Sequence, residues 1–363
     1  MRTAGLTAVI PRGLRSESPD LVCDNPNLFM RTASTSDIIE KVNRPCVVQS
    51  AIRMAHHKSG RRRITNQESA QAMIEPALRD QALLENIAAA NKNDGEFRLW
   101  WLRQSGFLLQ WNGRHLLLDP YLSDSLTKKY ADTPMPHVSM TALPIQPEHL
   151  NFIDVVTSSH THTDHLDAGT LLPLHRANPR LKLVAPEAER DVIEKKLSGR
   201  GPAIFGLDHG RSIDIDGFRI NAVASAHEDV ALDGAGRCRF LGYVVEFGKF
   251  AIYHSGDTVL HPNLVESLRP FRIDVALLPI NGRGPERGVA GNLNTQEAAE
   301  LGRDIGARIV IPCHYDMFVF NTAPVADFVT AARSAGQDYD VLQCGGRWES
   351  SRLGRHTAER QRR

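Results

Sequence analysis

Four side chains that can bind a metal ion lie within six positions of this sequence: His160, His162, Asp164 and His165. The residues just before them, 153–158, are mostly apolar or β-branched, which predicts a buried strand that ends where the cluster begins. Loops held by rigid strands often carry functional side chains. Packing alone does not explain such a cluster, and imidazole nitrogen with carboxylate oxygen suits zinc, manganese or iron. The chain is therefore expected to build a metal site at the end of this strand.

Three further apolar runs end in residues that could complete such a site. The runs are 222–226, 250–253 and 308–313, and each has the composition of a buried strand. The ligand-competent residues that follow them are His227, His254 with Asp257, and His314. The candidate ligands are thus expected at the ends of several separate strands.

The order and spacing of these residues resemble the metallo-β-lactamase superfamily, whose pattern is HxHxDH followed by a distal His, a bridging Asp and a final His. The resemblance covers roughly residues 96–349 and implies an α/β fold, the four-layer αβ/βα sandwich of that superfamily. Within the superfamily, the chain is most similar to the L-ascorbate-6-phosphate lactonase group. The residues that carry this narrower match are 99–102, 105–107, 253–257, 274–277 and 311–312 before His314.

The resemblance also implies two divalent metal ions, with zinc the first expectation and manganese the second. Carried over by position, the first ion would be held by His160, His162 and His227, the second by Asp164, His165 and His314, and Asp257 would bridge them. Two ions about 3.5 to 4 Å apart lower the pKa of a shared water and supply hydroxide near neutral pH.

The expected function is therefore a metal-dependent hydrolase that uses metal-bound hydroxide on a small anionic ester or lactone. A phosphodiesterase or phospholipase-D-like hydrolase is the alternative within enzymes. A metal-binding regulator without turnover is the alternative from another class.

Other polar residues have less specific roles. Asp164 could take a proton from the attacking water, and His254 could protonate a leaving group or be a hydrogen-bonded structural residue. Asp119 resembles the first acidic residue of the superfamily and is expected to orient ligands from behind. Trp100 and Trp101 alternate along a strand, so one is expected in the core and the other could face the cleft. The expected substrate contacts are Asn281, Arg283 and Arg287, which could equally form a plain surface turn, and Tyr315.

Composition excludes several classes of partner. The 363 residues include 43 basic and 42 acidic side chains, so no overall field would recruit nucleic acid. No apolar run approaches the roughly 20 residues of a membrane span. Five widely spaced cysteines without a CxxC pair suit a reducing cytoplasm. The expected partner is a small anionic substrate, and a homo-oligomer is possible.

Four parts are expected along the chain. Residues 1–60 lack sustained periodicity and are predicted to be a disordered extension, without the apolar region of a secretory signal. Residues 61–94 are predicted to form a helical segment that packs on the catalytic domain, which spans residues 95–350. Residues 351–363 form a basic tail.

Local signals predict turns and helix ends inside the catalytic domain. Hairpins are expected at residues 112–113, 216–217 and 248–249. Pro186 is expected at the first position of a helix that stops at Gly199. Asn294 and Glu297 have the spacing of a capping box at the start of another helix.

Overall fold

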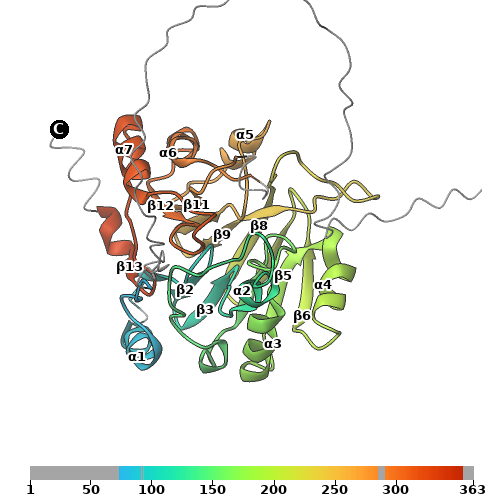
Figure 1. The fold of residues 1–363 in the computed structure, drawn as a ribbon. Coiled ribbons are helices and arrows are strands. Elements are labelled where there is room, and N and C mark those ends of the chain that lie inside the picture. The colour runs from blue at the N-terminus through green and yellow to red at the C-terminus, as the bar shows by residue number, and fades with distance from the viewer. Residues whose placement is uncertain (1–72, 91, 93, 285–290, 355–363) are drawn as a thin grey trace, which may run out of the picture. The chain divides into compact units, whose positions relative to one another are not determined.

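Two β-sheets face each other and are covered by helices on their outer sides, as the ribbon in Figure 1 shows. This arrangement comes from a computed structural model, which describes residues 73–90, 92, 94–284 and 291–354. The α/β sandwich predicted from the sequence is therefore the observed fold.

The first sheet has seven strands in the order β13-β1-β2-β3-β4-β5-β6. Its strands β13, β1, β2 and β3 pair antiparallel, whereas β3 to β6 pair parallel. The bounds are Phe97–Trp101 for β1, Phe107–Trp111 for β2, Arg114–Leu118 for β3, Val155–Thr157 for β4, Lys182–Pro186 for β5, Ala203–Leu207 for β6 and Arg347–Glu349 for β13.

The second sheet has six strands in the order β12-β11-β10-β9-β8-β7. Its strands β7 to β10 pair antiparallel, and β10, β11 and β12 pair parallel. The bounds are Ser212–Ile215 for β7, Phe218–Ala224 for β8, Leu241–Phe247 for β9, Phe250–His254 for β10, Val275–Pro279 for β11 and Ile309–Cys313 for β12. Each sheet therefore has a parallel part, where several strands end at the same edge.

Helices cover the outer face of each sheet. One set lies against the first sheet and consists of α1 (Asp80–Ala90), α3 (Ala168–Ala177) and α4 (Arg190–Lys196). The other set, labelled above the second sheet in Figure 1, consists of α5 (Leu264–Leu268), α6 (Thr295–Asp304) and α7 (Val325–Ala335). The short helix α2 (Ser125–Lys129) lies in the connection between β3 and β4. Among the described residues, no helix combines the length and apolar character needed to cross a membrane.

Alternating side chains of the first sheet separate two hydrophobic cores. Leu99 and Trp101 lie in the core shared with the second sheet, and Trp100 between them lies in the core beneath α1, α3 and α4. Consecutive side chains of a strand point to opposite faces, and both faces of this sheet are covered. Both tryptophans are therefore buried. This corrects the expectation that one of them could face the cleft, since helices cover the sheet's outer face.

The local turn and cap signals have mixed outcomes. Strand pairs β2–β3, β7–β8 and β9–β10 confirm the three predicted hairpins. The capping box is present, because Asn294 accepts from the backbone of Glu297 and Glu297 accepts from the backbone of Asn294. Pro186 instead ends β5 with an extended backbone (ψ 127°), and a 3₁₀ turn at Glu187–Glu189 precedes α4. The fixed φ of proline suits a strand end as well as a helix start.

Some predicted parts fall outside the described residues. These are residues 1–60, most of the basic tail and Arg287. Of the predicted helical segment 61–94, residues 80–90 form α1, which packs Leu83 and Ile87 into the core beneath the first sheet.

Candidate metal centre

The seven candidate ligands converge at the carboxyl-terminal ends of strands from both sheets. They follow β4, β8, β10 and β12 in the chain and form two groups. The first group is His160, His162 and His227, and the second is Asp164, His165, Asp257 and His314. Within each group the potential ligand atoms lie within 4.8 Å of one another. Ligands commonly bind in α/β proteins where parallel strands end at one edge.

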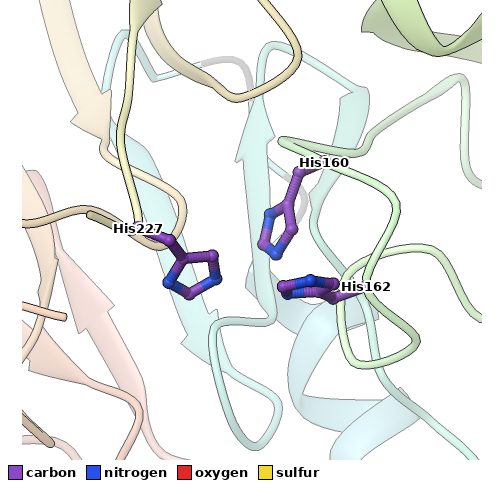
Figure 2. A group of neighbouring side chains, drawn as sticks. All are labelled: His160, His162 and His227. Atoms are coloured by element: carbon purple, nitrogen blue, oxygen red, sulfur yellow. The ribbon is translucent and has the colours of Figure 1, made fainter. Parts of the chain in front are cut away.

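The first group is shown in Figure 2, where the three imidazole rings approach one another from two separate loops. The ring of His160 contacts Ser159 Oγ through Nδ1 at 3.0 Å, and His227 Nδ1 donates to the carbonyl oxygen of Gly291 at 2.7 Å. A ring nitrogen that donates in this way leaves the opposite nitrogen as the lone-pair donor. Nε2 of His160 and of His227 is therefore the metal-competent atom.

The second group has the spacing of a single coordination shell. His165 Nε2 lies 3.2 Å from Asp257 Oδ1 and 3.7 Å from Asp164 Oδ2. His314 Nε2 lies 3.4 Å from Asp257 Oδ2 and 3.6 Å from Asp164 Oδ2. A tetrahedral zinc ion with ligands at about 2.0–2.2 Å separates its ligand atoms by roughly 3.3–3.6 Å. The four side chains could therefore hold one ion with little rearrangement.

Asp257 belongs to the second group and also lies beside the first. Its Oδ2 is 3.4 Å from His227 Nε2 in the first group and 3.4 Å from His314 Nε2 in the second. Its close approach depends on Gly256, which has φ +59°, and a Cβ there would lie 2.5 Å from Ser159 Cβ. The carboxylate of Asp257 therefore lies within reach of both ligand groups.

The hydrogen bonding of the centre supports metal binding by these side chains. Nε2 of His160, His165 and His227 and Oδ1 of Asp257 are buried without a hydrogen-bond partner among the described residues. Leaving such atoms unpaired costs about 1–3 kcal/mol each. One cation in each group would together satisfy all four, so the donor set fits the divalent ions that the fold implies.

A buried carboxylate outside the set of candidate ligands orients them through hydrogen bonds. Asp119 Oδ2 accepts from His165 Nδ1 at 2.7 Å, and Asp119 Oδ1 accepts from Ser159 N at 3.0 Å and from Thr157 Oγ1 at 3.1 Å. Ser159 Oγ also donates to this carboxylate. Asp119 thus fixes both the ring of His165 and the Ser159 hydroxyl that contacts His160, as expected from the sequence.

Electrostatics differ between the two groups. Burial lowers the pKa of His160 well below its usual value, and the neighbouring rings of His165 and His162 lower it further. For His165 burial also favours the neutral form, but the carboxylates of Asp257 and Asp164 outweigh it and raise the pKa well above the usual value. The ring of His160 is therefore neutral and able to bind an ion, whereas an ion that binds His165 has to displace a proton.

Left-handed backbone conformations accumulate around the centre. Asp119 has φ 39°, His314 has φ 61° and Asp316 has φ 53°, and none of them is glycine. The loop before β2 adds Arg103 at 75° and Gln104 at 44°. Non-glycine residues in this region cost about 1–3 kcal/mol and persist when their surroundings hold them in place. The backbone around the centre is thus constrained at several points.

Two predicted site residues lie behind the centre rather than in it. His254 is buried, and its Nε2 donates to the carbonyl oxygen of Ser105 at 2.8 Å. Tyr315 stacks near Trp101 with ring centroids 4.5 Å apart, and its hydroxyl donates to the carbonyl oxygen of Leu342 at 2.5 Å. This corrects the expectation that Tyr315 lines the pocket, because its aromatic ring fills the core and its hydroxyl is already used. For His254 the structural alternative matches the observed contact.

The predicted substrate loop is held by internal contacts. Asn281 Nδ2 donates to Asn321 Oδ1 at 2.9 Å, and Asn281 Oδ1 accepts from Asn292 Nδ2 at 3.1 Å. Arg283 pairs with Glu297 at 2.6 Å and has a side chain that is 47% exposed. Asn281 is therefore part of the loop's own scaffold, whereas Arg283 still reaches solvent.

Sequence reasoning did not select two side chains that contact the candidate ligands. Phe240 packs on the rings of His160, His162 and His227, with centroid distances of 5.0, 5.9 and 5.5 Å. Gln104 donates to Asp164 Oδ2 at 2.8 Å. Neither residue has a local signature, because each meets the ligands only through the tertiary fold.

Comparison with known proteins agrees with the fold and with a metal-dependent hydrolase. A family model described as a Beta-lactamase superfamily domain matches residues 114–315. A UPF0173 metal-dependent hydrolase of Methanoculleus marisnigri is 30% identical over 227 residues, which are 61% of this chain and 82% of that protein. Another from Saccharolobus solfataricus is 26% identical over 254 residues, or 68% of this chain and 97% of that protein.

A solved structure shows the same fold. The metallo hydrolase from the archaeon Ignicoccus hospitalis has a TM-score of 0.52 and 21% identity, and the match covers 70% of this chain and 98% of that one. Fold, donor set and relatives together define a metal-dependent hydrolase of the metallo-β-lactamase superfamily. Within that superfamily the chain belongs to the UPF0173 metal-dependent hydrolase family.

Proposed function

We propose that this hydrolase holds two divalent ions and cleaves a small anionic ester or lactone. His160, His162 and His227 would hold the first ion, Asp164, His165 and His314 the second, and Asp257 would bridge them. The observation that carries the proposal is the position of Asp257, with Oδ2 at 3.4 Å from a histidine of each group. Five imidazoles with two carboxylates suit zinc best, and manganese is the second choice.

Bound ions would lower the pKa of a coordinated water and polarise the oxygen of the scissile group. The protein's own contribution to the proton transfer is assigned to Asp164. Its side chain is 17% exposed, against 5% for Asp257, so it is the more accessible carboxylate of the second group. It would accept the proton of the attacking water as the new carbon–oxygen bond forms. Returning that proton to the leaving oxygen as the ester bond breaks completes the reaction.

Arg283 is the proposed contact for the anionic part of the substrate. Its side chain packs against Gly291, where an added Cβ would lie 2.8 Å from Arg283 Cβ, and Gly291 accepts the hydrogen bond from His227 Nδ1. Arg283 thus packs against the backbone that orients the candidate ligand His227. In its ion pair with Glu297 the arginine side chain is 47% exposed, so a substrate phosphate or carboxylate could compete for the guanidinium at modest cost. Arg287 is proposed for the same role from the sequence alone.

A substrate comparison tests this proposal. Turnover of phosphorylated sugar lactones is compared with turnover of bis-aryl phosphodiesters, using metal-reconstituted protein. We expect lactones to be preferred and Arg283→Ala to raise the KM for them. Arg303→Ala is the matched control, because Arg303 is also half exposed and pairs with a neighbouring acid, Asp304, at the end of α6. A clear preference for phosphodiesters would favour the phosphodiesterase alternative.

We also infer a cytoplasmic location and a small-molecule substrate. The inference of a reducing compartment is supported by Cys238, Cys313 and Cys344, which are buried free thiols. Self-association is a further expectation, which measurement of the mass in solution would test.

A further inference from the structure

The side-chain amide of Gln104 enters the second ligand group. Its Nε2 lies 2.8 Å from Asp164 Oδ2 and 3.0 Å from His314 Nε2, and the residue is 1% exposed. Asp164 Oδ2 is also the oxygen that lies 3.6 Å from His314 Nε2 and 3.7 Å from His165 Nε2. The amide therefore donates to the carboxylate oxygen that faces the proposed second ion.

Several independent contacts hold the loop that carries this amide. The carbonyl oxygen of Gln104 accepts from the backbone of His314 at 3.0 Å and from Trp101 Nε1 at 2.8 Å. The next carbonyl, that of Ser105, accepts from His254 Nε2 at 2.8 Å. These contacts keep Gln104 at φ 44°, a conformation that costs free energy and persists because its surroundings hold it in place. The position of the amide is thus specified by the fold.

A purely structural role does not account for a glutamine here. Its Oε1 is buried and has no hydrogen-bond partner among the residues that the structure describes. An unpaired buried amide oxygen costs about 1–3 kcal/mol, and an apolar side chain of the same length would avoid that cost. What the amide provides, and an apolar chain would not, is the hydrogen bond to Asp164 together with the polar contact to His314 Nε2.

We propose that Gln104 is a positioning residue that orients Asp164 for the second ion. The inference rests on the proposed two-ion function and adds a residue to it. A ligating carboxylate held by an outer hydrogen bond keeps its oxygen directed at the ion, and loss of such partners typically weakens metal affinity or activity about 10–100-fold. Gln104 thereby sets the affinity and the ligand geometry of the second site and leaves the first site unaffected.

The test uses Gln104→Met, which keeps the length of the side chain and removes the amide. The full-length protein is titrated with zinc against a competing chelator, and its cobalt-substituted form is examined by visible absorption. We expect affinity for the second ion to fall about 10–100-fold, with the first unchanged, and the cobalt spectrum to change.

Gln110→Met is the matched control. Gln110 is also 1% exposed and contacts a histidine ring, with its Nε2 3.0 Å from His115 Nε2, but His115 is not part of the metal centre. This variant should bind both ions like the wild type. If Gln104→Met does not fold, Gln104→Asn retracts the amide from Asp164 and should weaken the second site in the same way.

Two results would overturn the inference. Second-ion affinity within twofold of wild type in Gln104→Met, with an unchanged cobalt spectrum, would show that the amide does not position Asp164. A wild-type protein that takes up only one ion would refute the proposed two-ion function itself, and the inference with it. The first result leaves two-ion binding standing, so the two failures are distinguishable.

Discussion

Replacing Asp119 by asparagine should weaken metal binding although all seven candidate ligands remain, because Asp119 orients His165. Asp119 is fully buried, and its two oxygens accept from His165 Nδ1, Ser159 N, Ser159 Oγ and Thr157 Oγ1. Asparagine keeps one acceptor oxygen and replaces the other with an NH₂ group, which cannot accept from His165 Nδ1. The proton of His165 would then favour Nε2, and that nitrogen would lose its lone pair for the metal ion.

The expected loss follows from this change in hydrogen bonding. Outer partners of this kind are worth about 10–100-fold in metal affinity, or roughly 1.4–2.8 kcal/mol. The metal-free protein should also lose about 1–3 kcal/mol of unfolding free energy, because a buried donor is left unpaired. Chelator competition measures the first quantity, and urea denaturation in the presence of a chelator measures the second.

Asp274→Asn is the control for a buried aspartate outside the centre. Asp274 accepts from Arg308 at 2.8 Å and from the backbone of Ala251 at 3.1 Å. Its replacement should lower stability and leave metal affinity unchanged. Wild-type metal affinity in Asp119→Asn would refute the reasoning that Asp119 sets the ring state of His165.

Two further predictions concern protonation and packing. The pKa of His165 is raised in the metal-free protein, so its contribution to stability is present below about pH 6.5 and lost as the pH rises through the folded-state value. Denaturation of metal-free protein at increasing pH should show this loss, and a contribution that grows with pH would contradict it. Phe240→Ala removes the ring that packs on His160, His162 and His227, and should weaken first-ion affinity about 2–10-fold from contacts worth roughly 0.5–1.5 kcal/mol. Isothermal titration calorimetry would check this, and unchanged affinity would show that Phe240 does not contribute to binding of the first ion.

Features encoded by adjacent residues were predictable from the sequence. The turns at residues 112–113 and 216–217 need positive φ, which Asn, Asp and Gly tolerate, and all four residues adopt it. The capping box of α6 likewise depends on two side chains three positions apart, Asn294 and Glu297. The order of the candidate ligands was readable because each follows its own apolar strand.

Features that depend on contacts between distant segments were not predictable. Gln104 meets Asp164 across 60 positions, in a loop with no glycine at its left-handed residues. Tyr315 follows a candidate ligand directly, yet its ring turns to Trp101 and its hydroxyl to Leu342. Position along a strand indicates where the backbone of a residue lies, but packing against the other layers decides which partner its side chain contacts.

The most direct test of the account is the number of metal ions bound per chain. Elemental analysis after reconstitution and removal of free metal should give two ions for the wild type, because two ligand groups share Asp257. His160→Ala combined with His162→Ala should reduce the number to one by removing the first group. A wild-type stoichiometry of zero, or a stoichiometry that this double variant leaves unchanged, would contradict the proposed centre.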